Sequence, residues 1–247
     1  MPKLLLSVRS AHEASLAIEA GVDLIDIKEP SAGALGAASP EVIDEIVRLV
    51  NRRSSTSVAC GELIQSAADI AKRLPGSGAT PTGIWPDYVK VGLSGCGSID
   101  DWPQKWRQFL ALLPPRSAPV AVIYADWREA DAPPPAEVIE QARSVKRSAV
   151  LVDTFDKSGP GLLRLSSIEV VRALIDEVRG VGMSIAIAGQ LTFDDAVAVA
   201  LLGPDYVGVR GGVCRPDRNG DLDRERLMKW RSMVAYPDEA RRLAKQL

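Results

Sequence analysis

Residues 23–28 read DLIDIK, a short run of leucine and isoleucine that is broken by one acid and ends on one base. Because Leu24, Ile25 and Ile27 would fall on both faces of a strand, the run is typical of a strand buried on both sides in a parallel sheet. Similar runs recur along the chain. We expect strands at Leu4–Val8, Leu24–Ile27, Ser57–Cys60, Tyr88–Leu93, Val120–Tyr124, Val150–Thr154, Ser184–Ala188 and Tyr206–Val209.

Amphipathic helical patterns separate these runs. Ser39 and Pro40 start one helix as its N-cap and first-turn proline, the sequence 166–169 starts a second as a capping box, and Thr192 starts a third. Eight strand–helix units in 247 residues average about 31 residues each, close to the size of a βαβ repeat. Right-handed crossovers allow a doubly wound sheet or a closed barrel, and the count of eight without a GxGxxG after the first strand favours the barrel.

The expected fold is therefore an α/β protein of one domain, residues 1–247, folded as a (β/α)8 TIM barrel. Residues 236–247 are charged and helix-prone, and we expect them to form a C-terminal helical tail. The Gly/Pro-rich stretches 75–86 and 128–135 are expected to be surface loops, because the strand–helix order resumes after each of them.

Composition excludes several classes of protein. The net charge of −2 gives nothing that would attract nucleic acid or anionic lipid, and no apolar run approaches the roughly 18 residues of a membrane span. The N-terminal residues do not resemble a secretory signal, and the chain has only three cysteines, so we expect a cytoplasmic protein without a disulfide framework. A single histidine, His12, excludes a multi-histidine metal site and is expected on the surface.

Charged residues occur within the expected strands or just after them. In the second strand Asp26 and Lys28 are two residues apart and therefore on one face, where they could form a buried ion pair or an active centre. Lys90 lies in the fourth run, where burial would disfavour its ammonium form and make it a nucleophile or base, unless it reaches out to solvent. Asp153 ends the sixth run and Lys157 follows it. In (β/α)8 barrels these strand ends carry the chemistry.

Lysine is scarce in this chain, which has nine lysines and 21 arginines. Three lysines at strand ends therefore favour a catalytic role. Schiff-base chemistry needs a neutral amine, and crowded cations favour that form. We expect a phosphorylated aldehyde or ketone as the substrate, with carbon–carbon bond formation or cleavage, or dehydration, as the reaction class.

Glycine-rich segments follow the last two expected strands. Barrels often bind phosphate at these positions through backbone N–H groups, so Gly189, Gln190, Gly211 and Gly212 are candidate phosphate-binding residues. Arg210 adds a guanidinium that suits phosphate. Arg9, at the end of the first strand, is a further candidate for anion binding, or a structural partner of Asp26 or Glu29.

Two other features are interpreted as structural. The acidic stretch 217–223 lacks the spacing of a calcium loop, so we expect a turn in which Asp223 caps the last helix. Trp102, Trp106 and Phe109 have helical spacing and are expected in the core.

Six motifs in order along nearly the whole chain, together with DRNG (217–220), resemble the (5-formylfuran-3-yl)methyl phosphate synthase family, also called 4-(hydroxymethyl)-2-furancarboxaldehyde-phosphate synthase. They are DLIDIKEPSAGALGA (23–37), DYVKVGL (87–93), YAD (124–126), VDTFDKSG (152–159), AIAGQL (186–191) and DYVGVRGGVC (205–214). The chain departs from the archaeal pattern at Phe155 and Asp156.

The resemblance implies a (β/α)8 lyase of methanofuran biosynthesis, and so of one-carbon metabolism, that condenses two molecules of glyceraldehyde 3-phosphate with loss of phosphate and water. It implies that Lys28 forms the Schiff base and Lys90 accepts a proton, with Asp26, Asp153 and Lys157 in the same site. The expected partner is this triose phosphate, with no nucleic acid or membrane; no metal or other cofactor is expected, and the chain is compatible with a homo-oligomer.

Two alternatives remain at this stage. One is another barrel enzyme acting on a phosphorylated sugar, such as an aldolase or an isomerase of histidine or tryptophan biosynthesis. The other is a non-catalytic barrel that binds phosphorylated metabolites, which would tolerate Lys28→Arg because only the charge would matter.

Overall fold

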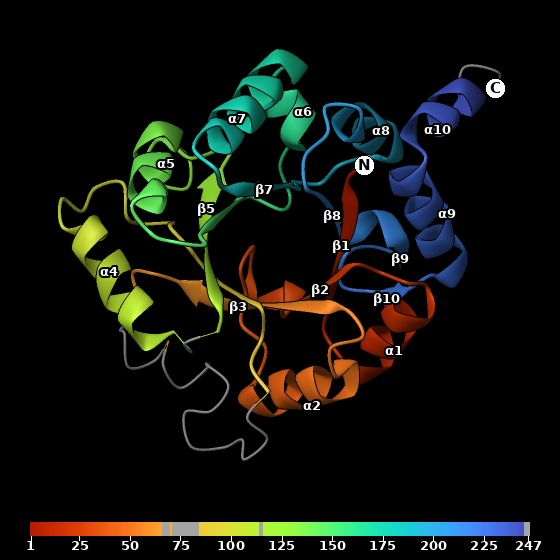
Figure 1. The fold of residues 1–247 in the computed structure, drawn as a ribbon, viewed down its shortest axis with the longest axis horizontal. Coiled ribbons are helices and arrows are strands. Elements are labelled where there is room, and N and C mark those ends of the chain that lie inside the picture. The colour runs from red at the N-terminus through yellow and green to blue at the C-terminus, as the bar shows by residue number, and fades with distance from the viewer. Residues whose placement is uncertain (66–69, 71–83, 114–115, 245–247) are drawn as a thin grey trace.

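Eight parallel strands form a closed barrel in a computed structural model that describes residues 1–65, 70, 84–113 and 116–244 (Figure 1). Each strand pairs with the next along the chain, and the last pairs with the first, as expected from the sequence. The strands are β1 (Lys3–Val8), β2 (Leu24–Ile27), β3 (Ser55–Glu62), β4 (Tyr88–Gly92), β5 (Ala118–Tyr124), β6 (Ala149–Asp153), β7 (Ser184–Ile187) and β8 (Tyr206–Val209).

Helices surround the barrel (Figure 1). They are α1 (Ala11–Glu19), α2 (Pro40–Val50), α4 (Trp102–Leu112), α5 (Pro135–Arg143), α6 (Leu162–Leu165), α7 (Ile168–Gly180), α8 (Phe193–Ala200), α9 (Arg224–Ala235) and α10 (Pro237–Ala244). Two 3₁₀ turns, η1 (Pro30–Ala32) and η2 (Gly211–Val213), and a small ribbon of β9 (Cys214–Arg215) and β10 (Asp221–Leu222) lie in the connections. The expected tail contains α10, which lies against α8 and α9.

The caps follow the sequence with one shift. Ser39 accepts the N–H of Val42 at the start of α2, and Thr192 forms a complete capping box with Asp195 on α8. Helix α7 is capped by Ser167 and not by Ser166, so the capping box expected over 166–169 is wrong by one position. Asp223 caps α9, as expected. These side chains satisfy N–H groups that have no partner within the helix.

Strand β3 differs most from its predicted range of Ser57–Cys60. It begins at Ser55 and continues to Glu62, with a register shift against β4 between Ala59 and Glu62. Gly61, at a φ of 85°, lies inside this shift. The extra length places an acidic side chain at the end of β3. Residues 128–134 form the expected connection after β5, while most of the predicted loop 75–86 lies outside the described residues.

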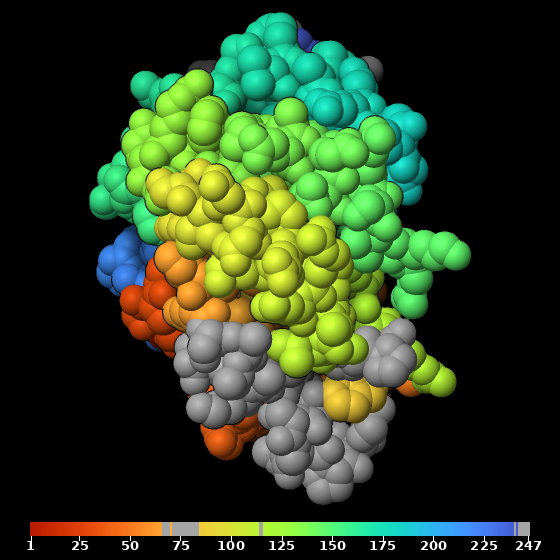
Figure 2. Space-filling model, turned by 90° about the vertical axis from the view of Figure 1, so that its left-hand side faces the viewer, coloured from red at the N-terminus to blue at the C-terminus, as the bar shows by residue number. Residues whose placement is uncertain are grey.

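The core lies inside the barrel and between the strands and helices. Trp102, Trp106 and Phe109 of α4 are buried as predicted, and the rings of Trp106 and Phe109 are 5.4 Å apart. Figure 2 shows the face where residues of α4 and α5 and their flanking segments form the middle of the surface. His12 is exposed and the three cysteines are buried. No helix in the described residues has the length and apolar character of a membrane span.

Strand register brings the polar residues together. Asp26 of β2 lies between Ser7 of β1 and Ser57 of β3, and Lys90 of β4 pairs with Ala59 of β3. On the far side of the barrel Tyr124 of β5 pairs with Asp153 of β6. Because residues in register share a face, these side chains enter the barrel from different directions toward its carboxyl end.

Candidate active site

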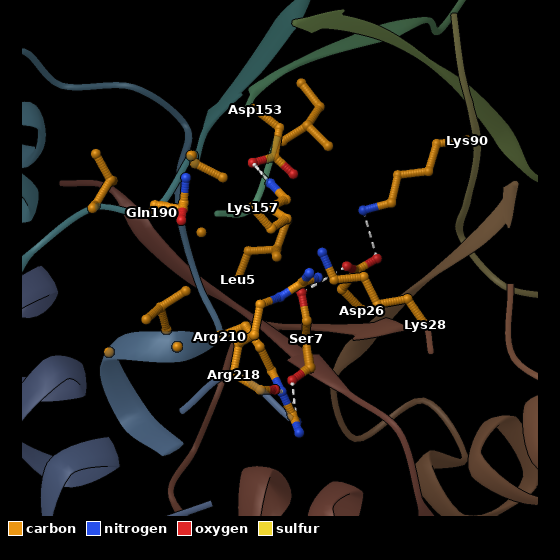
Figure 3. A pocket seen from close by; sticks show the side chains of 18 of the residues that line it. Leu5, Ser7, Asp26, Lys28, Lys90, Asp153, Lys157, Gln190, Arg210 and Arg218 are labelled. Atoms are coloured by element: carbon orange, nitrogen blue, oxygen red, sulfur yellow. Dashed lines mark hydrogen bonds and ion pairs between the residues drawn. The ribbon is translucent and has the colours of Figure 1, made fainter. Parts of the chain in front are cut away.

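A cavity of about 350 Å³ opens at the carboxyl ends of the strands, within the range of small-molecule sites (Figure 3). The residues that line it come from β1, β2, β4, β6 and β8 and from the connections that follow β2, β6, β7 and β8. Its charged residues are Asp26, Lys28, Lys90, Asp153, Lys157, Arg210, Asp217 and Arg218.

Asp26 and Lys90 form a buried ion pair, with 2.7 Å between Lys90 Nζ and Asp26 Oδ1. Ser57 donates to the same carboxylate at 2.6 Å and Ser7 at 2.9 Å. Burial alone would raise the pKa of Asp26, but Lys90, Lys28 and these hydrogen bonds hold it below its usual value. The sequence suggested that Asp26 would neutralise Lys28, which is two residues away. In the structure, Asp26 forms its ion pair with Lys90 instead.

Lys28 is 6% exposed, and its Nζ donates to the backbone oxygen of Ala34 at 3.2 Å. Within the described residues it forms no ion pair with a carboxylate, whereas Lys90 and Lys157 both do. Burial lowers the pKa of Lys28 from its usual 10.5 to about 8, with Asp153 opposing and Lys157 assisting the shift. A fraction of about one tenth is therefore the neutral, nucleophilic amine at pH 7.

Asp153 and Lys157 form a second pair, with 2.7 Å between Lys157 Nζ and Asp153 Oδ1. Burial would raise the pKa of Asp153, but Lys157 and Lys28 hold it below its usual value. The N–H of Thr154 also donates to this carboxylate. Both pairs face the same cavity (Figure 3).

Asp126 holds the segment that carries Lys157. Its buried carboxylate accepts the N–H of Phe155 at 2.7 Å and the N–H of Asp156 at 2.8 Å. The turn after β6 is thereby fixed from β5, and the side chain of Lys157 returns to Asp153. Asp126 was recognised only as part of the YAD motif.

Glu62 and Tyr124 form a hydrogen-bonded pair that sequence reasoning did not identify. Tyr124 Oη donates to Glu62 Oε1 at 2.8 Å, and the N–H of Ser94 donates to Glu62 Oε2 at 2.9 Å. A Cβ at residue 92 would overlap both Oη and Oε2, so Gly92 is required for the pair to form. Burial raises the pKa of Glu62. The acid could not be located from sequence because β3 was expected to end before it.

The segment after β7, where phosphate binding was predicted, lines the cavity. Gly189 and Gln190 both have positive φ, of 104° and 51°. The Gln190 side chain faces the preceding connection, with Nε2 at 3.1 Å from the oxygen of Asp156 and 3.4 Å from Oγ1 of Thr154. Gln190 therefore fixes the neighbouring turn through its side chain, which leaves its backbone as the candidate group for phosphate.

Arg210 has a different role from the one suggested by the sequence. Its Nε donates to the oxygen of Arg218 at 2.9 Å, Nη1 donates to Ser7 O at 3.1 Å and to Glu13, and Nη2 donates to Glu13 at 3.1 Å and to Gly220 O at 3.0 Å. An arginine has five N–H donors, so all of them are used by the protein. The prediction that this guanidinium binds phosphate is therefore wrong. Arg210 instead supports the segment that contains Arg218 and Gly220.

Arg9 is outside the residues that line the cavity. Its Nε is 3.5 Å from Glu13 Oε1 and its Nη2 is 3.2 Å from Asp221 Oδ1. These contacts support the structural interpretation of Arg9, with different acidic partners from the ones considered. Gly211 and Gly212 do line the cavity, and a Cβ at Gly212 would lie 2.6 Å from the ring of Trp230.

Arg218 lines the cavity and was not among the predicted site residues. It lies between β9 and β10, in the DRNG motif, where the sequence indicated a turn. Only the resemblance of this motif could have drawn attention to it.

The arrangement combines the buried amine of Lys28, two lysine–aspartate pairs and the guanidinium of Arg218, which has no ion-pair partner among the described residues. In the part of the chain that the structure describes, no group of three His, Cys, Asp or Glu residues has the arrangement of a metal site. The groups present can form an imine and transfer protons.

Comparison with known proteins agrees with these motifs. The family model described as 4-HFC-P synthase matches residues 4–231. The chain is 33% identical to the (5-formylfuran-3-yl)methyl phosphate synthase of Methanopyrus kandleri, over 92% of this chain and 96% of the relative. It is 35% identical to the putative (5-formylfuran-3-yl)methyl phosphate synthase of Methylorubrum extorquens, over 92% and 89%.

The fold is also similar to that of 3-hexulose-6-phosphate synthase from Salmonella typhimurium, with a TM-score of 0.57, 16% identity, and coverage of 94% of this chain and 99% of that one. That likeness concerns the barrel alone. The sequence matches are of another kind, since they span the segments that carry Lys28, Lys90, Lys157 and Arg218. The chain belongs to the 4-HFC-P synthase family.

Proposed function

We propose that this chain is a (5-formylfuran-3-yl)methyl phosphate synthase that condenses two molecules of glyceraldehyde 3-phosphate, with loss of phosphate and water, through an imine on Lys28. Family membership supports the synthase role. The observation that carries the proposal is the buried Lys28 amine, which has no carboxylate partner among the described residues and lies in a cavity beside two lysine–aspartate pairs. The proposed reaction is that of a carbon–oxygen lyase acting on phosphates and uses no cofactor.

The first step is attack of Lys28 Nζ on the aldehyde carbon of one substrate. The carbinolamine then loses its hydroxyl group as water, which leaves a protonated imine. Ala34 O accepts a hydrogen bond from Lys28 Nζ and orients the amine toward the cavity. An imine draws electrons from the adjacent carbon and makes its proton removable.

Lys90 supplies and then accepts protons in this scheme. Paired with Asp26, its ammonium group donates a proton to the departing hydroxyl group, and the resulting amine removes the proton next to the imine. The enamine that forms attacks the aldehyde carbon of the second substrate. Ser7 and Ser57 keep the Asp26 carboxylate in place during these transfers.

Lys157 and Asp153 serve the later steps. The Lys157 ammonium group protonates the oxygen produced by carbon–carbon bond formation, and the pair moves protons during dehydration and phosphate loss. Attack of a substrate hydroxyl group on the imine carbon closes the furan ring and displaces the Lys28 amine, so the two substrates leave as the furan aldehyde, one phosphate and two waters. Substrate phosphate is bound in this scheme by backbone N–H groups that line the cavity, those of Gly189, Gln190, Gly211 and Gly212. Proton-transfer groups of this kind contribute about 10²- to 10⁴-fold each to the rate.

Borohydride trapping tests the proposal. Glyceraldehyde 3-phosphate with borohydride should give a mass adduct that peptide mapping places on Lys28, and Lys28→Arg should abolish it. Lys146→Arg, at an exposed lysine after α5, is the matched control and should trap normally. Without borohydride, the wild-type chain should form the furan aldehyde and release phosphate, both measurable by mass spectrometry and a phosphate assay.

The pH dependence gives a second test. Because the pKa of Lys28 is about 8, the rate of adduct formation should rise about tenfold per unit below pH 8 and level off above it. An adduct on Lys90 or Lys157 instead would reassign the nucleophile. No adduct with folded protein would exclude the imine and return the isomerase and binding-protein alternatives.

A further inference from the structure

In the part of the chain that the structure describes, five cationic side chains line the cavity, and most have an acidic partner. Lys90 pairs with Asp26, Lys157 with Asp153, and Arg210 with Glu13. The two cations that remain are Lys28 and Arg218. Among the described residues Arg218 forms no ion pair, and its one hydrogen bond runs from Nη2 to the oxygen of Gly33 at 3.3 Å.

The segment that carries Arg218 is held firmly by the protein. Buried Arg210 donates to the backbone oxygens of Arg218 and Gly220, at 2.9 and 3.0 Å. The N–H of Asn219 donates to Asp217 Oδ1 at 2.7 Å, and a Cβ at Gly220 would overlap the backbone of Arg215. The well-anchored segment therefore presents the half-buried guanidinium of Arg218 to the cavity, with four N–H donors that no described residue uses.

The surroundings of Arg218 suit a doubly charged anion. Arg218, Gly211 and Gly212 all follow β8 and line the cavity. Figure 3 shows Arg218 beside Arg210 and Ser7, across the cavity from Lys157 and Asp153. Planar guanidinium groups bind phosphate through two parallel hydrogen bonds. Because Gly33 precedes Ala34, whose oxygen accepts from Lys28, a ligand of Arg218 would lie next to the segment that orients the nucleophile.

We propose that Arg218 is the side chain that binds the phosphate group of the substrate and thereby selects phosphorylated over unphosphorylated aldehydes. This inference rests on the proposed function for the identity of the aldehyde, but not for the binding of phosphate. The role that the sequence suggested for Arg210 thus passes to the residue that Arg210 supports.

A comparison of two substrates tests the inference. The second-order rate constant for adduct formation with glyceraldehyde 3-phosphate should be about 10- to 100-fold lower in Arg218→Gln than in wild type. The reason is that the variant lacks a charged hydrogen-bonding partner of the phosphate group. With unphosphorylated glyceraldehyde the same variant should react at the wild-type rate. Arg218→Lys should recover part of the loss, because it restores the charge without the two parallel hydrogen bonds.

Arg215→Gln is the matched control. Arg215 lies on β9, is exposed, pairs with Asp223 and is outside the cavity lining. The Arg215→Gln variant should form adducts with both aldehydes at the wild-type rates. An equal loss with both aldehydes in Arg218→Gln would show a structural role and overturn the proposal, and so would no loss with either.

Inorganic phosphate separates this inference from the proposed function. Calorimetric titration of the wild-type chain with phosphate should show binding that Arg218→Gln weakens by a similar factor and Arg215→Gln does not. If neither aldehyde gives an adduct, the imine proposal fails while this titration still decides the role of Arg218. Equal phosphate affinity in wild type and Arg218→Gln would refute it.

Discussion

Lys28 lowers the stability of the folded state, because burial removes its positive charge from water. The unfolded chain keeps the proton up to pH 10.5, whereas the folded chain releases it at about pH 8. Below pH 8 the folded state therefore carries the full penalty, and between 8 and 10.5 the unfolded state binds more protons, so stability rises with pH. A shift of about 2.5 units at 1.36 kcal/mol each amounts to about 3 kcal/mol.

Lys28→Met should therefore stabilise the protein by about 3 kcal/mol at pH 7 and abolish adduct formation. The gain should disappear as the pH rises from 8 to 10.5. Urea unfolding at both ends of this range measures it, with Lys146→Met as the exposed control. A variant that is no more stable than wild type at pH 7 would show that Lys28 is not held at such a cost.

Among the elements, the connection after β6 depends on β5 for its shape. The β6–α6 connection contains Lys157, and Asp126, which follows β5, accepts two of its backbone N–H groups. Gln190 contacts the same connection from the β7 side. Lys157 is thus positioned by residues on both neighbouring strand ends, a common arrangement for loops that a barrel holds in place.

Asp126→Ala should lower kcat about 10- to 100-fold and cost about 1–3 kcal/mol in stability, because two N–H groups lose their acceptor and Lys157 loses its position. Hydrogen exchange at residues 155–158 should become faster. Asp126→Asn keeps one acceptor oxygen and should be intermediate. Glu129→Ala, at an exposed position of the preceding connection, is the control. Normal kcat with faster exchange would show that the connection need not be fixed for activity.

For the molecule as a whole, one buried ion pair connects the first helix of the barrel with the segment that follows its last strand. Glu13 of α1 pairs with Arg210, which follows β8, 197 residues later, where β8 closes the barrel against β1. Arg210 also donates to Ser7 O of β1. Removing one partner of such a pair leaves a charge buried without compensation, which is far more costly than losing an exposed pair.

Glu13→Gln should therefore destabilise the protein by about 3–5 kcal/mol, measured by urea unfolding. Glu140→Gln breaks the exposed pair with Arg143 and should cost at most about 1 kcal/mol. Similar small effects from both variants would mean that barrel closure does not depend on the buried pair.

Strand periodicity and local chemistry were readable in the sequence. All eight strands, the caps at Ser39, Thr192 and Asp223, and the face shared by Asp26 and Lys28 follow from spacings of a few residues. These features depend on contacts within one segment, where the two-residue period of strands and the cap preferences of helices act. The motif order also indicated the family before any geometry was known.

Partners across the barrel were decided only by the tertiary structure. Lys90 neutralises Asp26, Arg210 is used up by Glu13 and backbone oxygens, Arg218 is left facing the cavity, and the register shift in β3 brings Glu62 to Tyr124. The side-chain pairs among these contacts, Lys90 with Asp26, Arg210 with Glu13 and Tyr124 with Glu62, each join residues more than 30 positions apart. The two-residue period of a strand predicts which face a side chain lies on, but not which side chain lies opposite it. The opposing partner depends on closure, register and burial together, so the sequence by itself determined the set of charged groups and the fold determined which of them remain free to bind and react.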